Sequence, residues 1–265
     1  MIIDGKAVAR DRYKKLAPRY AALGRAIHLG IIVVGENPVI ESFVRIKTRS
    51  AEQLGIEMVR VNLPESSTTE EVVAAVRGLA ERTDALIVQL PLPKQVDTDA
   101  VLSAIPSDKD VDALNPAISE SERMVHAPVA LAVVELLKKG GVEIRGKRTV
   151  VVGAGRLVGR PAQWLLMSLG AEVSMFTLEE GSIEDLKDAD IIVSGAGNPG
   201  MIRPEHIRAG VALIDAGTSE QGKKIRGDAT ESCAEKAAVF TPVPGGVGPV
   251  AVAMIFRNLL TLVEA

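Results

Sequence analysis

Two patterns of apolar and polar positions follow one another along the chain. Apolar residues spaced three to four positions apart predict helices, and short apolar runs that stop at glycine or proline predict buried strands. The run at 28–34, for example, stops at Gly35-Glu36-Asn37-Pro38. Helices are predicted at 6–24, 39–54, from 67 onward, and at 126–145, 156–169, 182–188, 203–209 and 251–262; strands are predicted at 28–34, 56–61, 85–89, 149–152, 172–176, 190–193 and 211–215.

Alternating strands and helices predict right-handed crossovers and parallel sheets. The length of 265 residues suits two domains better than one. We therefore predict an α/β fold with two domains. An N-terminal α/β domain would span residues 1–125, with a C-terminal helix at 250–265 returning to it, and a Rossmann-type parallel-sheet domain would span 126–249.

Composition argues against a nucleic-acid partner. The chain has one Trp, two Tyr and four Phe, and its 31 Lys and Arg face 34 Asp and Glu, for a net charge of −3. Proteins that bind nucleic acids rely on aromatic platforms and basic surfaces, and this chain has few of either. Hydrophobic residues at 47% and charged residues at 25% are typical of a globular protein.

Cysteine and histidine usage gives no sign of a metal site. Cys233 is the only cysteine, and His28, His126 and His206 lie far apart in the sequence. This excludes an intramolecular disulfide and a cysteine-based zinc cluster. No uninterrupted run of about 18 apolar residues and no N-terminal signal pattern is present, so we expect no metal, no membrane partner and a cytoplasmic location.

A glycine-rich turn lies between the strand predicted at 149–152 and the helix predicted at 156–169. Gly153 permits the tight turn, and Gly155 lets the backbone approach a pyrophosphate, which the helix N-terminus would bind. Val158 stands where the third glycine of the usual motif would be. The strand–turn–helix context nevertheless predicts a dinucleotide site that includes Ala154 and Arg156.

The next strand is followed by Thr177-Leu178-Glu179-Glu180. An acid at this position can accept hydrogen bonds from the ribose hydroxyls and would repel a 2′-phosphate, which favours NAD over NADP. The alternative is that Glu179 and Glu180 belong to an ordinary solvated loop.

Four separated segments resemble the methylenetetrahydrofolate dehydrogenase/cyclohydrolase family, and the resemblance covers nearly the whole chain in order. The most specific stretches are Val-Gln-Leu-Pro-Leu-Pro at 88–93 and Pro-Val-Pro-Gly-Gly-Val-Gly-Pro at 242–249. The other two are Gly-Glu-Asn-Pro-Val-Ile-Glu-Ser-Phe-Val-Arg-Ile-Lys at 35–47 and Lys-Asp-Val-Asp at 109–112.

The resemblance implies roles for individual residues. Lys47 matches the essential lysine, Gln89 the glutamine that orients it, and Asp112 the aspartate that holds the pterin ring. Phe43 lies four positions before Lys47 and so shares its helix face, where an apolar ring and an amide can lower a lysine pKa. Pro244, Gly245 and Gly246 are implied to bind substrate, and Gly153, Ala154, Gly155, Arg156, Glu179 and Thr218 to bind the cofactor.

The family carries out two reactions in a cleft between its domains. Hydride passes from 5,10-methylenetetrahydrofolate to NAD or NADP, and the methenyl product is then hydrolysed to 10-formyltetrahydrofolate. Cofactor binding and positioning serve the first step, and proton transfer by the lysine serves the second. The family is also expected to form homodimers.

This chain departs from the family at several positions. Phe43 replaces a tyrosine, and Ala127-Pro128-Val129-Ala130 replaces Pro-Cys-Thr-Pro. Ala154 and Leu178 replace the Arg and Ser that the family associates with the 2′-phosphate of NADP, and Val250-Ala251 replaces Met-Thr. Two alternatives to a bifunctional enzyme stay open: a monofunctional member, with one activity weakened at Phe43 and 127–130, and a non-catalytic folate- or nucleotide-binding relative.

Overall fold

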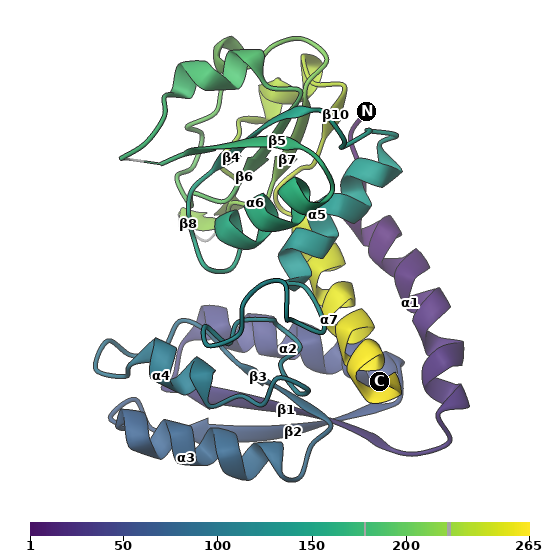
Figure 1. The fold of residues 1–265 in the computed structure, drawn as a ribbon, viewed down its shortest axis with the longest axis vertical. Helices are drawn as coiled ribbons and strands as arrows, with labels where there is room; N and C mark the ends of the chain where they lie inside the picture. The colour runs from purple at the N-terminus through teal and green to yellow at the C-terminus, as the bar shows by residue number, and fades with distance from the viewer. Residues whose placement is uncertain (178, 222–223) are drawn as a thin grey trace. The chain divides into compact units, whose positions relative to one another are not determined.

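The computed structural model describes residues 1–177, 179–221 and 224–265, and the chain divides into two compact units (Figure 1). Residues 11–128 and 255–265 form one, which we name the three-stranded unit, and residues 1–10 and 129–254 form the other, the five-stranded unit. Helices α1 (Gly5–Ala22) and α7 (Val247–Glu264) each contribute residues to both units.

The three-stranded unit contains a parallel sheet in the order β2–β1–β3, and α2 and α3 lie on opposite faces of it (Figure 1). Val76 and Leu79 of α3 pack with Ile32 and Leu86 of the sheet in an apolar cluster of this unit. Its elements are β1 (Ile27–Val34), α2 (Pro38–Gln53), β2 (Ile56–Leu63), α3 (Thr69–Ala80), β3 (Ala85–Val88) and α4 (Thr98–Ser103).

The five-stranded unit contains a parallel sheet in the order β10–β7–β6–β4–β5. Because β5 and β6 lie on opposite sides of β4, the strand order reverses at β4, and ligands of such sheets bind at the carboxyl end of that point. Its elements are α5 (Pro128–Lys139), β4 (Arg148–Val152), α6 (Gly159–Ser168), β5 (Glu172–Phe176), η1 (Ile183–Asp188), β6 (Ile191–Ser194), η2 (Pro204–His206), β7 (Ala212–Asp215), β8 (Ser219–Gln221), β9 (Lys224–Arg226), η3 (Glu231–Glu235) and β10 (Val239–Phe240).

The predicted α/β fold with two domains and parallel sheets is confirmed. The N-terminal boundary differs from the expected one, since residues 1–10 group with the five-stranded unit rather than with the domain predicted at 1–125. The reason is backbone pairing: Ile2 forms a parallel bridge with Phe240, and the Ile3 amide donates to the Phe240 carbonyl over 2.9 Å.

Several element boundaries also differ. The helix predicted at 126–145 ends at Lys139, because Gly140 and Gly141 follow and Gly141 has φ of +69°. The helix predicted from 156 begins at Gly159, and the helix predicted from 67 begins at Thr69, capped by Thr68 and Glu71. The segments predicted as helices at 182–188 and 203–209 form 3₁₀ turns, and α4 and the short strands β8, β9 and β10 were missed.

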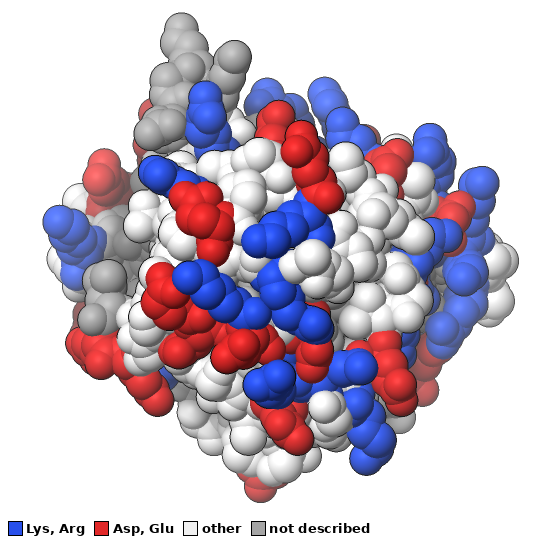
Figure 2. All heavy atoms as spheres, turned by 90° about the horizontal axis from the view of Figure 1, so that it is seen from above, with Lys and Arg blue, Asp and Glu red and all other residues white. Residues whose placement is uncertain are grey.

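Charged side chains of both signs intermingle on the face seen in Figure 2. Helix α7 has the length and composition of a membrane-spanning helix, but more than half of it is buried within the protein. Burial of that kind is typical of a core helix, so α7 is weak evidence for a membrane span.

Candidate active site

Lys47 and Gln89 come from separate elements of the three-stranded unit and are joined by a hydrogen bond. Asn37 caps α2 by accepting hydrogen bonds from the Val39 and Ile40 amides, and Lys47 lies in a later turn of that helix. Gln89 directly follows β3 and is 8% exposed. Lys47 Nζ donates to Gln89 Oε1 over 2.8 Å.

The orientation of the Gln89 amide is fixed from its other side. Its Nε2 donates to the Leu90 carbonyl over 2.8 Å, so its oxygen is the atom that faces Lys47. From the sequence, the pairing of these two residues was implied only by the family resemblance. The hydrogen bond between them now gives it a physical basis.

Asp112 is the third member of this cluster. Burial lowers the pKa of Lys47, and the nearby Asp112 carboxylate opposes that change. Burial raises the pKa of Asp112, and the Lys47 ammonium opposes this in turn. Lys47 therefore releases its proton more readily than a solvated lysine does, which suits a group that accepts and returns protons.

Phe43 belongs to an exposed apolar strip on α2. Val39, Phe43 and Ile46 are 43%, 39% and 44% exposed and lie at the spacing of one helix face, beside Lys47. The opposite side of the helix, with Ile40 and Val44, is buried. An exposed apolar strip next to a lysine with a lowered pKa offers contact area for the apolar part of a ligand.

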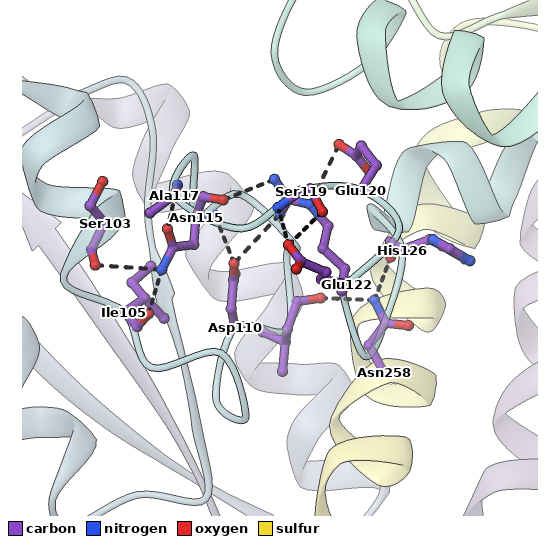
Figure 3. A network of polar contacts seen from close by, with 12 residues as sticks. Ser103, Ile105, Asp110, Asn115, Ala117, Ser119, Glu120, Glu122, His126 and Asn258 are labelled. Atoms are coloured by element: carbon purple, nitrogen blue, oxygen red, sulfur yellow. Dashed lines mark hydrogen bonds and ion pairs between the residues drawn. The ribbon is translucent and has the colours of Figure 1, made fainter.

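The segment that carries Asp112 is held at both ends by one side chain from α7. Asn258 is 2% exposed, and its Nδ2 donates to the carbonyls of Val111 and His126 over 2.8 Å each (Figure 3). This amide ties the start of the segment at 111–126 to its end. Asn258 was not predicted, because nothing in its local sequence distinguishes it from other helix positions.

Asp110 and Arg123 hold the same segment from within, both through Asn115 (Asp110 and Asn115 are labelled in Figure 3). Asp110 Oδ2 accepts a hydrogen bond from the Asn115 amide over 2.8 Å, and Arg123 donates to the Asn115 carbonyl over 2.9 Å. Burial raises the pKa of Asp110 to about 6. Between Asp110 and Asn115, Ala113 has φ of +54°, a left-handed conformation that disfavours any residue with a Cβ.

In the five-stranded unit, the predicted dinucleotide turn follows β4 as expected, and Gly159 performs the packing role of the third glycine. A Cβ on Gly159 would overlap the Gly153 carbonyl, so only glycine lets α6 start this close to the turn. Val158, which the sequence analysis took as the replaced position, instead packs against Gly195. The motif is therefore complete in space, with its last glycine shifted by one residue.

The residues present at this turn fit a pyrophosphate group. No side chain caps the N-terminus of α6. In its first turn Pro161 has no amide hydrogen and the Arg160 amide donates to the Gly155 carbonyl over 3.2 Å, so this N-terminus offers an anion the Gly159 amide and the positive end of the helix dipole. Gly155 has open space where a Cβ would be, and Ala154, Gly155 and Arg156 are exposed. Thr218, also predicted to bind the cofactor, is exposed beyond β7, at the same edge of the sheet.

The loop after β5 lies beside the turn, because the Gly153 amide donates to the Phe176 carbonyl over 2.8 Å. Thr177 Oγ1 accepts hydrogen bonds from the amides of Glu179 and Glu180 over 3.2 and 3.1 Å, which leaves both acidic side chains exposed. Leu178, on which part of the cofactor prediction depended, lies outside the described residues.

Pro244, Gly245 and Gly246 form a turn that precedes α7 in the five-stranded unit. Gly245 has φ of +106°, and the Gly246 amide donates to the Pro242 carbonyl over 2.7 Å. Among the described residues, no group of three or more His, Cys, Asp or Glu side chains is arranged to hold a metal ion.

Comparison with known proteins identifies the family. Residues 3–112 match the description "Tetrahydrofolate dehydrogenase/cyclohydrolase, catalytic domain", and residues 127–265 match "Tetrahydrofolate dehydrogenase/cyclohydrolase, NAD(P)-binding domain". The chain belongs to the tetrahydrofolate dehydrogenase/cyclohydrolase family. This confirms the resemblance found in the sequence, while the roles of the individual site residues stay predictions.

Full-length relatives agree with this family assignment. The chain is 38% identical to "Bifunctional protein FolD" of Methanospirillum hungatei over 97% of its own length and 95% of the relative's. The bifunctional enzyme FolD from Campylobacter jejuni has a similar structure, with a TM-score of 0.94, 31% identity and coverage of 100% and 98% of the two chains. FolD from Trypanosoma brucei, solved with NADP cofactor and an inhibitor, has a TM-score of 0.93, 36% identity and coverage of 100% and 97%.

Proposed function

We propose that this protein oxidises 5,10-methylenetetrahydrofolate to the methenyl form with NAD or NADP and hydrolyses that product to 10-formyltetrahydrofolate. The observation that carries the proposal is the Lys47–Gln89 hydrogen bond beside Asp112, in a chain that matches both domains of the family. This cluster favours a working enzyme over a relative that only binds folate or nucleotide, because simple binding has no need of a lysine with a lowered pKa.

In the first reaction, the residues of the chain bind and orient. The dinucleotide, when bound, supplies the hydride acceptor. The α6 N-terminus and the Gly153–Gly155 turn hold its pyrophosphate. On the folate, the Asp112 carboxylate accepts hydrogen bonds from N–H groups of the pterin ring, and the Phe43 strip contacts the apolar part of the molecule.

In the second reaction, Lys47 moves protons. Water adds to the methenyl carbon and loses a proton, and a ring nitrogen gains a proton as its bond to that carbon breaks. A lysine with a lowered pKa can accept the first proton as a neutral amine and return a proton as an ammonium. Gln89 holds the Lys47 amine in one position during both transfers.

We propose NAD as the preferred cofactor. The support comes from Ala154, which stands where the family has an Arg, and from the exposed carboxylate of Glu179 in the adjacent loop, which would repel a 2′-phosphate. Arg156, exposed in the same turn, is the cation that could still meet a phosphate. The NADP in the T. brucei relative's structure is a property of that protein, so the preference has to be measured here.

One assay measures reduction of NAD or of NADP with 5,10-methylenetetrahydrofolate as the substrate. A second assay measures hydrolysis of the methenyl compound. Both activities, with NAD favoured, are expected. If only hydride transfer or only hydrolysis is found, the monofunctional alternative is supported. If both activities are absent, the non-catalytic alternative is supported. A strong preference for NADP would overturn the cofactor proposal.

The homodimer and the cytoplasmic location stay predictions. Light scattering on the purified protein measures its mass in solution, and a monomer would overturn the first. Localisation of the tagged protein in its own cell tests the second.

A further inference from the structure

Two buried aspartates of the five-stranded unit lie outside the predicted site. Asp215 ends β7 and is 1% exposed, and Asp228 follows β9 and is 0% exposed. Two carboxylates buried side by side repel each other and lose hydration, so this arrangement requires compensating hydrogen bonds.

Asp228 receives these hydrogen bonds from the segment that leaves β6. Its Oδ2 accepts from Ser194 Oγ over 2.6 Å and from the Ala196 amide over 2.8 Å, and its Oδ1 accepts from the Asn198 amide over 2.7 Å. The backbone at 194–198 is thus wrapped around one carboxylate.

Asp215 joins the start of the segment that leaves β7 to the segment that follows β9. Its Oδ1 accepts hydrogen bonds from the amides of Gly217 and Asp228 over 2.9 and 3.2 Å, and its Oδ2 accepts from the Ala229 amide over 2.8 Å. The packing is tight, because a Cβ on Gly217 would overlap the Asp228 carboxylate. Thr218, predicted to bind the cofactor, comes next in the chain.

The segment held by Asp228 packs directly against the dinucleotide turn. A Cβ on Gly153 would lie 2.9 Å from the Gly195 carbonyl and 3.0 Å from Ala196 Cα. A Cβ on Gly195 would overlap the Val158 side chain at the start of α6. A shift in the backbone at 195–198 would therefore displace the turn or the α6 N-terminus.

We propose that Asp228, supported by Asp215, is a positioning residue for dinucleotide binding: its carboxylate fixes segment 194–198 against the Gly153 turn and so sets the shape of the pyrophosphate site. The inference rests on the proposed function. It gives a reason for a costly buried pair of carboxylates whose hydrogen bonds hold the backbone that follows β6 and β7, at the carboxyl ends of these strands.

The test separates dinucleotide binding from folate chemistry in the Asp228→Asn variant. An asparagine side chain accepts through one oxygen only, so the amides of Ala196 and Asn198, which donate to different oxygens of the Asp228 carboxylate, cannot both be retained. We expect the dissociation constants for NAD and NADP, measured by calorimetry, to rise about tenfold or more, as for loss of a hydrogen bond to a charged group. Hydrolysis of the methenyl substrate, assayed without dinucleotide, is expected to stay within about twofold.

Asp190→Asn is the matched control. Asp190 belongs to the same unit and accepts a backbone hydrogen bond from the Arg148 amide over 2.9 Å, but it precedes β6 and so lies at the opposite edge of the sheet. The Asp190→Asn variant should bind NAD and NADP with the same affinity as the wild type. Equal weakening in both variants, or no weakening in Asp228→Asn, overturns the inference.

If the Asp228→Asn variant also loses hydrolysis, Ser194→Ala provides a second test of the positioning role of Asp228. This variant removes one donor to Asp228 and changes little volume. Weaker dinucleotide binding with full hydrolysis supports the inference, and unchanged binding overturns it. A wild-type protein that binds neither NAD nor NADP overturns the proposed function as well, which distinguishes the two failures.

Discussion

Lys47 donates its ammonium hydrogen bond to the side-chain oxygen of Gln89 over 2.8 Å, and the other end of the same amide is held by the Leu90 carbonyl. A lysine side chain has several rotatable bonds, so an amine that must meet a substrate atom needs this kind of restraint. The helix supplies the lysine, the strand end supplies the amide, and the fold joins residues that lie 42 positions apart.

Replacing Lys47 should remove hydrolysis of the methenyl substrate. Lys47→Ala deletes the proton-transfer group, and Lys47→Arg keeps a positive charge that does not give up its proton. We expect hydrolysis to fall about 100-fold or more in both variants, the usual range for loss of a general acid–base group. Wild-type hydrolysis in Lys47→Arg would show that only the charge of this residue matters.

Asp112→Asn should shift the pH dependence of hydrolysis. The Asp112 carboxylate raises the pKa of Lys47, so its neutralisation lowers that pKa further and makes the neutral amine more abundant at a given pH. The acidic limb of the kcat–pH profile is therefore expected to move to lower pH, together with a higher KM for folate. Asp108→Asn, an exposed neighbour, should leave the profile unchanged.

Phe43→Tyr tests the departure from the family at the exposed face of α2. The ring at this position is 39% exposed and shares its face with Lys47, so a hydroxyl would fit without repacking the core. We expect faster methenyl hydrolysis and unchanged hydride transfer, measured as separate rates. A change in hydride transfer alone would contradict the role assigned to this ring.

Ala113→Gly should be tolerated far better than an ordinary alanine-to-glycine change. Ala113 has φ of +54°, where an L-residue loses roughly 1–2 kcal/mol that glycine does not. Relief of this strain offsets the entropy that glycine loses on folding, so stability should stay unchanged or rise by up to about 1 kcal/mol in urea denaturation. Ala74→Gly, at an exposed interior position of α3, should lose about 1 kcal/mol.

The parts of this fold that could be predicted from the sequence are those determined by interactions between residues near one another in the chain. The run at 28–34 is apolar from Leu29 to Val34 because β1 is covered on both faces there, and the stop at Gly35 and Asn37 matches the observed start of α2. The glycine turn after β4 was predicted because a tight turn and a close approach to a ligand both require glycine.

The missed features depend on contacts between distant parts of the chain. Gly159 ends a Gly-x-Gly-x-x-x-Gly spacing that can be seen in the sequence, but only the structure shows that it packs against Gly153. Asn258 holds carbonyls 147 and 132 positions away, and Asp228 holds amides 32 and 30 positions away. Strand β10 has two residues, too few for a periodic pattern.

The stability of the protein should fall as the pH rises towards 7, through Asp215. Burial and the neighbouring Asp228 raise the pKa of Asp215 to about 7 in the folded state, from an ordinary value of 3.8. Because the folded-state pKa is raised, the stabilising contribution is complete below the unfolded-state pKa and is lost as the pH rises through the folded-state value. Each pH unit inside that window should remove up to about 1.4 kcal/mol from the free energy of unfolding.

Asp215→Asn isolates this effect, because asparagine does not titrate. Denaturant unfolding at pH 5, 6, 7 and 8, at constant ionic strength, gives the difference in stability between wild type and variant. That difference should shift in favour of the variant from pH 5 to 7 and then become constant. Asp110, whose pKa is raised to about 6, also makes the free energy of unfolding depend on pH. Its contribution is the same in wild type and variant and therefore cancels from the difference between them. Parallel curves for the two proteins would mean that Asp215 is ionised throughout this range.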